Sequence, residues 1–336
     1  MSAADEPLEA RVAELTFYGV VKARCCWVFA KLRLADRLAA GPRTSDELAR
    51  ETATEPQSLY RVLRALSVAG VVEERDGRTF ALTDLGAAFR SEPGSMRGWA
   101  EFAGEPFYFR AWADIGHTVE TGRPAFEHVH GAPFFDYLAD HADQSRIFDA
   151  AMTSLSANDA PAIVSAYDFA PFRRVADIGG GQGALLFEVM RRHPHVEGTL
   201  FDLPHVVEAA RMSAHELGLA DRLTVVSGDF FVEVPPADAY LLKFILHDWD
   251  DAACLRILES CRRSISAVGR LFAIELLVPP PGVPGNEKLD DVEMMTLLGS
   301  RERTEGEFAA LFESAGFRLG GVTPTGWMNV IEAVPV

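Results

Sequence analysis

The sequence RVADIGGGQGA, residues 174–184, joins a short apolar run to a glycine-rich turn. Its glycines let the chain turn sharply into the amphipathic run 184–193 and let the backbone approach a ligand closely. A strand, a glycine-rich turn and a helix in this order are typical of nucleotide-binding α/β folds. Gly179, Gly181 and Ala184 also fit the dinucleotide pattern GxGxxG/A, so the turn alone does not identify the nucleotide.

Short apolar runs alternate with amphipathic segments from about residue 172 onward, which predicts a parallel sheet with helices on both faces. The five expected strands are 174–178, 198–201, 223–226, 239–246 and 270–277. Two further runs, 317–322 and 328–334, flank a short turn containing Pro and Gly and predict an antiparallel pair at the sheet edge. For residues 171–336 we therefore expect an α/β fold, a Rossmann-like doubly wound sheet with an antiparallel edge hairpin.

The amino-terminal region, residues 1–95, reads as a mostly helical domain of winged-helix type. A helix is expected over residues 56–69, where apolar side chains repeat at three-to-four spacing. The apolar runs 71–74 and 79–82 follow it and flank Asp76-Gly77, a favoured pair for a tight hairpin turn. A helix followed by a two-stranded wing predicts a winged helix-turn-helix.

A winged helix most often binds DNA, but the charge of this chain argues against that role. The whole chain has 32 basic and 49 acidic residues, a formal net charge of −17. Residues 41–90 carry seven basic and eight acidic side chains, and the expected second helix offers only Arg61 and Arg64. Phosphate binding needs a basic surface, so we expect a packing or dimerisation domain and no nucleic-acid partner. A DNA-binding regulator whose second domain senses a ligand stays an alternative.

Residues 96–170 link the two regions, and they are mostly helical and rich in Trp, Phe and Tyr. Aromatic side chains of this kind can build a helical core or line a flat pocket. We expect this segment to be a helical linker that lines a substrate site.

Four cysteines occur, Cys25, Cys26, Cys254 and Cys261, and no pair of CxxC units is present to hold zinc. We therefore expect reduced thiols, no bound metal and a cytoplasmic location. The first 15 residues do not resemble a signal peptide, and no stretch reaches 18 uncharged apolar residues. No membrane association is expected.

Polar residues end the successive strands, at the edge where open parallel sheets bind their ligands. They are Asp177, Asp202, Asp229, His247 and Glu275. Asp202 lies 23 residues after Gly179, where a carboxylate can accept hydrogen bonds from both hydroxyls of a ribose. Asp229 can accept one from an exocyclic amine, while Phe230 covers an adenine face. Each acidic residue taken singly is compatible with a solvated loop or a helix cap, but the series in strand order predicts a nucleoside site.

These motifs resemble the S-adenosylmethionine-dependent small-molecule O-methyltransferases with a winged-helix dimerisation domain, the family of plant caffeate and flavonoid enzymes and bacterial antibiotic-tailoring enzymes. The resemblance covers nearly the whole chain, and its most specific parts are VADIGGGQG (175–183), GDFF (228–231), LHDWDD (246–251) and RERT (301–304). It implies S-adenosyl-L-methionine as the cofactor and methyl transfer to a phenolic hydroxyl of a small aromatic natural product. It also implies a homodimer. Residues 8–40 are expected to be helical, and the apolar positions within 12–38 also favour a dimer contact.

The resemblance also implies roles for individual residues. His247 matches the catalytic base, and Glu275 and Glu302 match the two carboxylates that flank it, one of which would fix the imidazole tautomer. The implied cofactor-binding residues are Asp177, Gly179, Gly181, Asp202, Asp229, Phe230, Lys243 and Trp249. The implied substrate-binding residues, each of which is equally compatible with core packing, are Phe148, Met152, Asn158, Met294 and Met295.

Two other activities stay open on the sequence. Some bacterial members of the family that this chain resembles bind S-adenosylmethionine and carry out hydroxylation or decarboxylation. The presence of His247 at the position of the catalytic base favours methyl transfer over these reactions. A nicotinamide-dependent oxidoreductase would use the pattern formed by Gly179, Gly181 and Ala184. The sequence identifies neither the acceptor nor the hydroxyl that is methylated.

Overall fold

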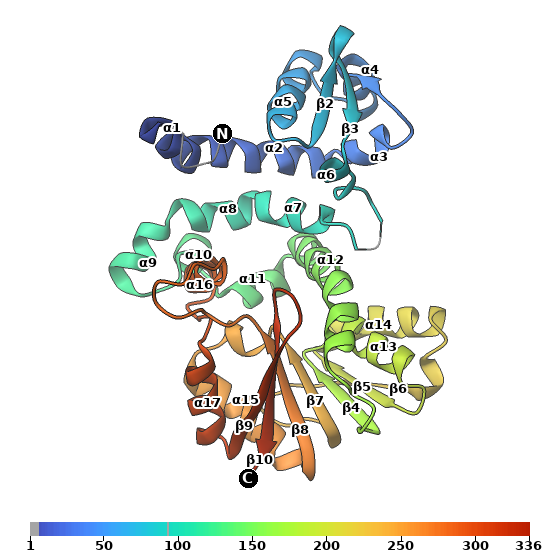
Figure 1. The fold of residues 1–336 in the computed structure, drawn as a ribbon, viewed down its shortest axis with the longest axis vertical. Helices are drawn as coiled ribbons and strands as arrows, with labels where there is room; N and C mark the ends of the chain where they lie inside the picture. The colour runs from blue at the N-terminus through green and yellow to red at the C-terminus, as the bar shows by residue number, and fades with distance from the viewer. Residues whose placement is uncertain (1–6, 93) are drawn as a thin grey trace. The chain divides into compact units, whose positions relative to one another are not determined.

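The computed structural model describes residues 7–92 and 94–336, which form two compact units (Figure 1). The first unit runs up to Arg110 and includes His141–Leu155. The second consists of Ala111–Asp140 and Ser156–Val336. The three domains expected from the sequence, 1–95, 96–170 and 171–336, remain a prediction.

A helical segment opens the first unit. α1 (Leu8–Ala13) passes through a π-helical stretch, Glu14–Tyr18, into α2 (Gly19–Lys31). Arg33 then adopts a left-handed conformation with φ of 51°, which separates α2 from α3 (Leu34–Leu38). The helical character expected over this stretch is confirmed, with a break that apolar periodicity did not indicate.

Two helices precede the wing. α4 (Ser45–Thr52) begins at a capping box, in which Thr44 and Glu47 accept hydrogen bonds from each other's backbone N–H groups. α5 (Pro56–Val68) has Pro at its first position and buries one apolar face in the core of the unit. The helix expected over residues 56–69 is confirmed.

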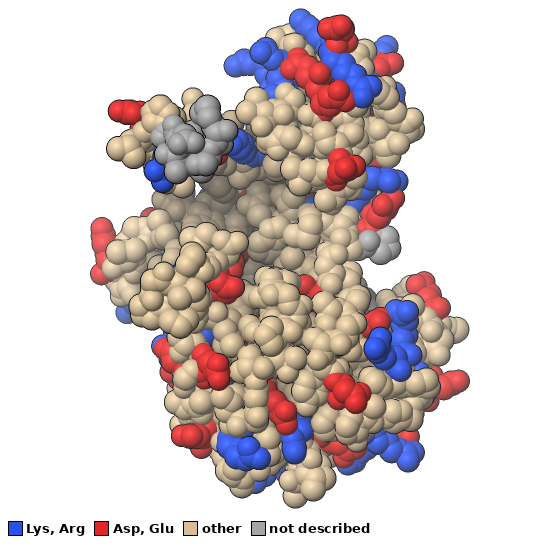
Figure 2. Space-filling view, viewed as in Figure 1, with Lys and Arg blue, Asp and Glu red and all other residues tan. Residues whose placement is uncertain are grey.

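The wing consists of β2 (Val72–Arg75) and β3 (Thr79–Leu82), paired antiparallel. Gly77 lies between them with φ of 70°, a conformation that glycine adopts without strain. β1 (Arg43–Thr44) completes a sheet of order β1-β3-β2, and α6 (Asp84–Ala87) follows. The predicted winged helix is therefore present. On the face drawn in Figure 2, basic side chains are interspersed with acidic ones.

Further helices follow the wing in the chain and precede the first strand of the large sheet. They are α7 (Arg97–Gly104), α8 (Pro106–Ala113), α9 (Ile115–Thr121), α10 (Ala125–His130), α11 (Phe134–Asp140) and α12 (Ala142–Ala166). Within the first unit, Phe102 packs against Phe107, Tyr108 and Phe148. These aromatic residues therefore contribute to a helical core, one of the two roles that the sequence allowed.

The second unit contains a sheet of seven strands in the order β6-β5-β4-β7-β8-β10-β9. The parallel strands are β4 (Arg174–Ile178), β5 (Glu197–Asp202), β6 (Leu223–Ser227), β7 (Ala237–Lys243) and β8 (Ile265–Glu275). β9 (Phe317–Pro324) and β10 (Asn329–Pro335) pair antiparallel, and β10 joins them to β8. The chain winds outward from β4 in both directions, so the order reverses between β4 and β7.

Helices cover both faces of this sheet, as Figure 1 shows. They are α13 (Ala184–Arg192), α14 (Pro204–Glu216), α15 (Asp251–Ser264) and α17 (Glu305–Ser314), with α16 (Glu287–Leu297) at the edge that carries the strand ends. Side chains of β4 alternate between the two cores: Val175 packs with α13 and α14, and Ala176 packs with α15 and α17. The predicted α/β doubly wound fold with an antiparallel edge hairpin is confirmed.

Two strands end earlier than their apolar patterns predicted. β8 begins at Ile265, before the expected run 270–277, and stops at Glu275. The run 239–246 was expected to be extended throughout, but β7 stops at Lys243. Phe244 adopts a left-handed conformation with φ of 54°, and Leu246–Asp248 form a 3-10 turn. Apolar residues continue because this turn is buried, and burial does not distinguish a strand from a turn.

None of the described helices combines the length and apolar character needed to cross a bilayer.

Candidate active site

The polar residues expected at the strand ends lie along one edge of the sheet. Asp202, Lys243 and Glu275 are the last residues of β5, β7 and β8, and Asp177 is the last but one of β4. Because these strands are parallel, their carboxyl ends meet at the same edge, beside the reversal of strand order where such sheets bind ligands.

The glycine turn after β4 has a backbone shape that side chains would disturb. Gly179 and Gly181 adopt φ of 68° and 58°. A Cβ atom at Gly179 would clash with the Ile245 side chain, and one at Gly180 would lie 2.6 Å from the Cγ atom of Asp177. A Cβ atom at Gly181 would meet no atom within 4 Å, so this part of the turn faces open space.

Asp202 is fixed by the backbone around it. Its Oδ2 atom accepts a hydrogen bond of 2.8 Å from the Gly181 N–H, and its Oδ1 atom accepts one of 2.7 Å from Leu203. These two backbone contacts fix the orientation of the carboxylate at the end of β5. Asp177 is buried beneath the turn, and its burial, together with the Asp202 charge, raises its pKa to about 7.

Aromatic rings gather beside the end of β6. Phe230, Phe231 and Trp249 lie with ring centroids 4.8–6.0 Å apart in edge-to-face contacts. Asp229, immediately before them, accepts a hydrogen bond from the Phe231 N–H at 2.8 Å. The structure thus brings together a carboxylate and the aromatic faces that the GDFF and LHDWDD motifs predicted.

Lys243 is paired within the chain. Its Nζ atom lies 3.2 Å from the Asp159 Oδ2 atom and donates a hydrogen bond of 3.2 Å to Ser156. Burial lowers the pKa of Lys243, and the Asp159 charge acts in the opposite direction. Asp159 also accepts a hydrogen bond of 2.8 Å from the Trp327 indole. Sequence reasoning had no signal for Asp159, because this residue lies in a helix 84 residues before Lys243.

His247 lies in the 3-10 turn after β7 and is buried. Glu302 Oε1 accepts a hydrogen bond of 2.7 Å from the His247 Nδ1 atom, and Glu275 Oε2 lies 3.9 Å from the same nitrogen. Asp248 Oδ1 is 3.3 Å from the Nε2 atom. The ring stacks on Phe244 with centroids 4.8 Å apart and an interplanar angle of 14°. Three carboxyl groups therefore surround one imidazole.

The two flanking glutamates have different hydrogen-bond partners. Glu275 Oε1 accepts hydrogen bonds from the backbone N–H groups of Ile245 and Leu246, at 3.1 and 2.9 Å. Glu275 therefore holds the turn that carries the imidazole, whereas Glu302 contacts the ring itself at hydrogen-bond distance. Sequence reasoning left this choice open, and the geometry distinguishes the two side chains.

The electrostatics of this group favour a positive charge on His247. Burial alone would lower the pKa of His247, but the charges of Asp248 and Glu275 and the contact with Glu302 outweigh it and raise the pKa to about 10. Burial raises the pKa of Glu275 to about 7 and that of Asp248 to about 6, and the neighbouring imidazolium opposes both shifts.

Arg303 is a buried cation that the sequence analysis passed over, although it belongs to the RERT motif. It donates hydrogen bonds of 2.7 and 2.9 Å to the carbonyl oxygens of Leu246 and Trp249, and one of 2.8 Å to Asp251. These bonds bracket the segment that carries His247. In the sequence, Arg303 is visible only as an arginine next to Glu302, and that neighbour does not indicate that the arginine is buried.

The predicted substrate-binding residues are distributed over both units. Phe148 and Met152 lie on α12 in the first unit, and Asn158 lies on the same helix in the second unit and is exposed. Met294 and Met295 lie on α16 and are half-buried. That these five residues line one acceptor site remains a prediction.

Comparison with known proteins identifies the family. A family model described as the O-methyltransferase domain matches residues 112–318, and one described as the O-methyltransferase dimerisation domain matches residues 15–92. This chain belongs to the O-methyltransferase family. Membership favours S-adenosylmethionine over a nicotinamide dinucleotide as the cofactor of this O-methyltransferase, as the GDFF and LHDWDD motifs implied.

Individual relatives align over almost their whole length. A phenazine O-methyltransferase of Lysobacter antibioticus is 44% identical over 92% of this chain and 92% of its own. The aclacinomycin 10-hydroxylase of Streptomyces purpurascens is 38% identical over 89% of this chain and 82% of its own. Among solved structures, LaPhzM has a TM-score of 0.93 at 42% identity, covering 98% of this O-methyltransferase and 100% of its own chain. CalO1, a methyltransferase in calicheamicin biosynthesis solved with S-adenosylhomocysteine, has a TM-score of 0.84 at 36% identity, with coverage of 98% and 99%.

Proposed function

We propose that this O-methyltransferase transfers a methyl group to a phenolic hydroxyl of a small aromatic natural product, with His247 as the general base. The observation that carries the proposal is the buried His247–Glu302 pair, placed by the turn after β7 at the ligand-binding edge of the sheet. A phenol with a pKa near 10 is a poor nucleophile at neutral pH, so transfer to its oxygen requires a base at that edge.

The strand-end residues fit the nucleoside of the cofactor. Asp202 ends β5 with a carboxylate that the turn backbone orients, the glycine turn faces open space at Gly181, and Phe230 follows Asp229 directly in the chain. Lys243 would act with Asp159 rather than as an isolated cation. When bound, S-adenosylmethionine supplies a methyl carbon that its sulfonium activates for in-line displacement.

The imidazole then does the proton chemistry. With the Nδ1–H directed at Glu302, the Nε2 lone pair takes the proton of the acceptor hydroxyl as its oxygen attacks the methyl carbon. The acceptor oxygen would gain the methyl group and lose its proton to His247, S-adenosylhomocysteine would be the leaving group, and His247 would hold the proton until it passes to solvent. The carboxyl groups around the ring stabilise the imidazolium that forms.

A mass measurement tests the reaction. We expect the enzyme, S-adenosylmethionine and a panel of hydroxylated aromatics to give products about 14 Da heavier than the acceptor, one CH2 group. His247→Gln should lose most turnover, by about 10²–10⁴, and retain S-adenosylhomocysteine binding by calorimetry. Products about 16 Da heavier, one oxygen atom, would instead establish the hydroxylation alternative. Full turnover by His247→Gln would remove the base assignment.

We propose further that the protein is a homodimer through its first unit. The dimerisation-domain match covers residues 15–92, and the segment before α2 exposes large apolar side chains. Leu8, Leu15 and Phe17 are 71%, 82% and 60% exposed. Exposed apolar side chains that recur along one segment indicate a protein contact surface.

The cytoplasmic location and the lack of a nucleic-acid partner stay proposals that rest on the sequence. A gel shift against genomic fragments tests whether the protein binds nucleic acid.

A further inference from the structure

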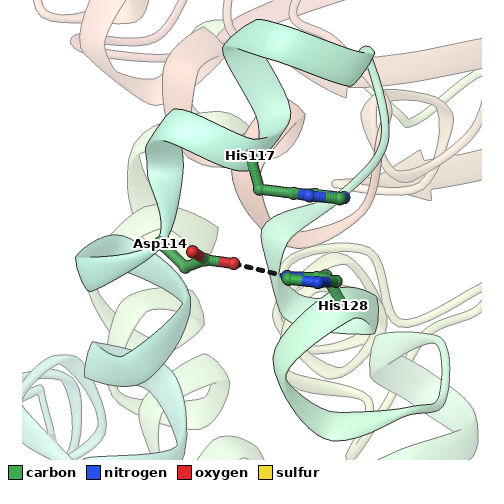
Figure 3. A group of neighbouring side chains, drawn as sticks. All are labelled: Asp114, His117 and His128. Carbon is green, nitrogen blue, oxygen red and sulfur yellow. Dashed lines mark hydrogen bonds and ion pairs between the residues drawn. The ribbon is translucent and has the colours of Figure 1, made fainter.

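A second group of side chains of the kind that can hold a metal ion lies on and beside the helices before α12, and it includes none of the strand-end residues. Asp114 precedes α9, His117 lies on α9, and His128 lies on α10 (Figure 3). One ligand atom from each of the three side chains lies within 4.8 Å of the other two. The three residues belong to the second unit, and the proposed methyl transfer uses none of them.

The Asp114 side chain is directed at His128 and not at its own helix. Asp114 occupies the N-cap position of α9, where an aspartate normally accepts a hydrogen bond from the first turn, yet it makes no side-chain cap. Its Oδ2 atom instead lies 2.7 Å from the His128 Nδ1 atom. The dashed line in Figure 3 marks this contact between the two helices.

The two imidazole rings lie face to face. Their centroids are 3.8 Å apart and their planes differ by 3°. The two helices therefore present two imidazole rings side by side, next to the Asp114 carboxylate. Histidine side chains are common ligands of metal ions in proteins.

We propose that Asp114, His117 and His128 bind a divalent first-row transition metal ion, with water at the remaining positions. Two imidazoles and one carboxylate suit Zn²⁺, Ni²⁺ or Cu²⁺, whereas Mg²⁺ and Ca²⁺ prefer sites built from oxygen atoms. Zn–N and Zn–O bonds of about 2.0–2.2 Å in a tetrahedral site would require the Asp114 and His128 donors, 2.7 Å apart, to separate slightly and the two parallel rings to tilt out of their stack. The His128 side chain is 55% exposed, so it has room to do so.

Such an ion would join α9 to α10. Both helices pack against α16, which carries Met294 and Met295. Metal binding would therefore stabilise the helices beneath a segment that we expect to line the acceptor site.

Calorimetry on the full-length, chelator-treated protein tests the site, with Zn²⁺ as the probe and Mg²⁺ as the comparison. We expect one equivalent of Zn²⁺ to bind, Mg²⁺ not to compete, and the melting temperature to rise with Zn²⁺. His117→Ala and His128→Ala should each lose that equivalent and the shift in melting temperature. Asp114→Asn, which keeps the size of the side chain, should weaken binding.

Two control variants separate this site from other histidines. His195→Ala removes an exposed histidine whose ring contacts the Ala170 carbonyl oxygen, and it should bind Zn²⁺ as the wild type does. His247→Gln disrupts the buried group formed with Glu275 and Glu302, the other set of close donors among the described residues, and it should also keep the equivalent. The proposal is overturned if the wild type binds no Zn²⁺, or if His117→Ala and His128→Ala bind it unchanged.

Discussion

The imidazole of His247 is held by carboxyl groups that act on it differently. Glu302 contacts the Nδ1 atom at 2.7 Å, whereas Glu275 accepts hydrogen bonds from the backbone of the turn. The tautomer depends on the one side chain that is hydrogen-bonded to the ring.

Replacing each glutamate by glutamine should therefore give different kinetics. We expect Glu302→Gln to lower kcat by about 10²–10⁴ at every pH, because the amide can also hold the unproductive tautomer. Glu275→Gln keeps an oxygen for Ile245 and Leu246, so its kcat at high pH should approach that of the wild type. Pre-steady-state rates with one phenolic acceptor measure both variants, and equal losses at high pH would contradict the distinction.

The dependence of activity on pH follows from the charge on His247. Since its pKa is raised to about 10, the ring is mostly protonated at pH 7 and becomes a competent base as the pH rises. We expect kcat/KM for a phenolic acceptor to increase by roughly tenfold per pH unit above pH 7 and to level off near pH 10. An acceptor whose phenol is already ionised at pH 6 should give a flat profile. If kcat/KM for an acceptor with an un-ionised phenol levelled off near pH 7, the carboxyl groups would not raise the pKa of His247 in this way.

Within the element that joins β4 to α13, each glycine meets a different constraint. Gly179 combines a φ of 68° with contact against Ile245, whereas Gly181 has a φ of 58° and faces open space. Substitution at Gly179 should therefore disturb packing of the turn. Substitution at Gly181 should act on backbone strain and on the space left for the cofactor.

Gly179→Ala should lower the free energy of unfolding by about 1–3 kcal/mol and weaken S-adenosylhomocysteine binding, because the added methyl group cannot be accommodated without moving the turn. Gly306→Ala is the matched control: it lies in α17, and a Cβ atom there meets nothing within 4 Å. It should leave stability unchanged or raise it by up to about 1 kcal/mol. Chemical denaturation and calorimetry measure both effects, and equal stability of the two variants would contradict the packing argument.

At the scale of the whole molecule, the proposed dimer should depend on the exposed apolar residues of the first unit. Leu15→Glu and Phe17→Glu each place a charge in that surface, so we expect the dimer to dissociate at micromolar concentration. Val268→Glu is the control, because Val268 is 83% exposed but lies in the second unit. Sedimentation velocity separates the two forms. A wild type that sediments as a monomer, or a dimer that tolerates both glutamates, would contradict the proposal.

The sequence by itself determined the order and type of the elements. Short apolar runs, helical spacing and glycine or proline turns are local signals, and they located the seven strands of the sheet, the winged helix and the glycine turn. The apolar runs also predicted that acidic residues lie at strand ends, because a strand is expected to end where its apolar run ends. The same local signals could not show that β7 ends at Lys243, since a buried turn is as apolar as a buried strand.

Only the tertiary structure decided which side chains meet. Glu302 lies 55 residues after His247 in the chain, and Asp159 lies 84 residues before Lys243, so neither pair leaves a periodic signal. The same holds for Arg303, whose burial depends on the carbonyl oxygens of Leu246 and Trp249 turning toward it. His117 and His128 likewise lie on separate helices, and the contact between their rings leaves no periodic signal in the sequence. Contacts of this kind arise from how helices and strands pack, and the chain order constrains that packing only weakly.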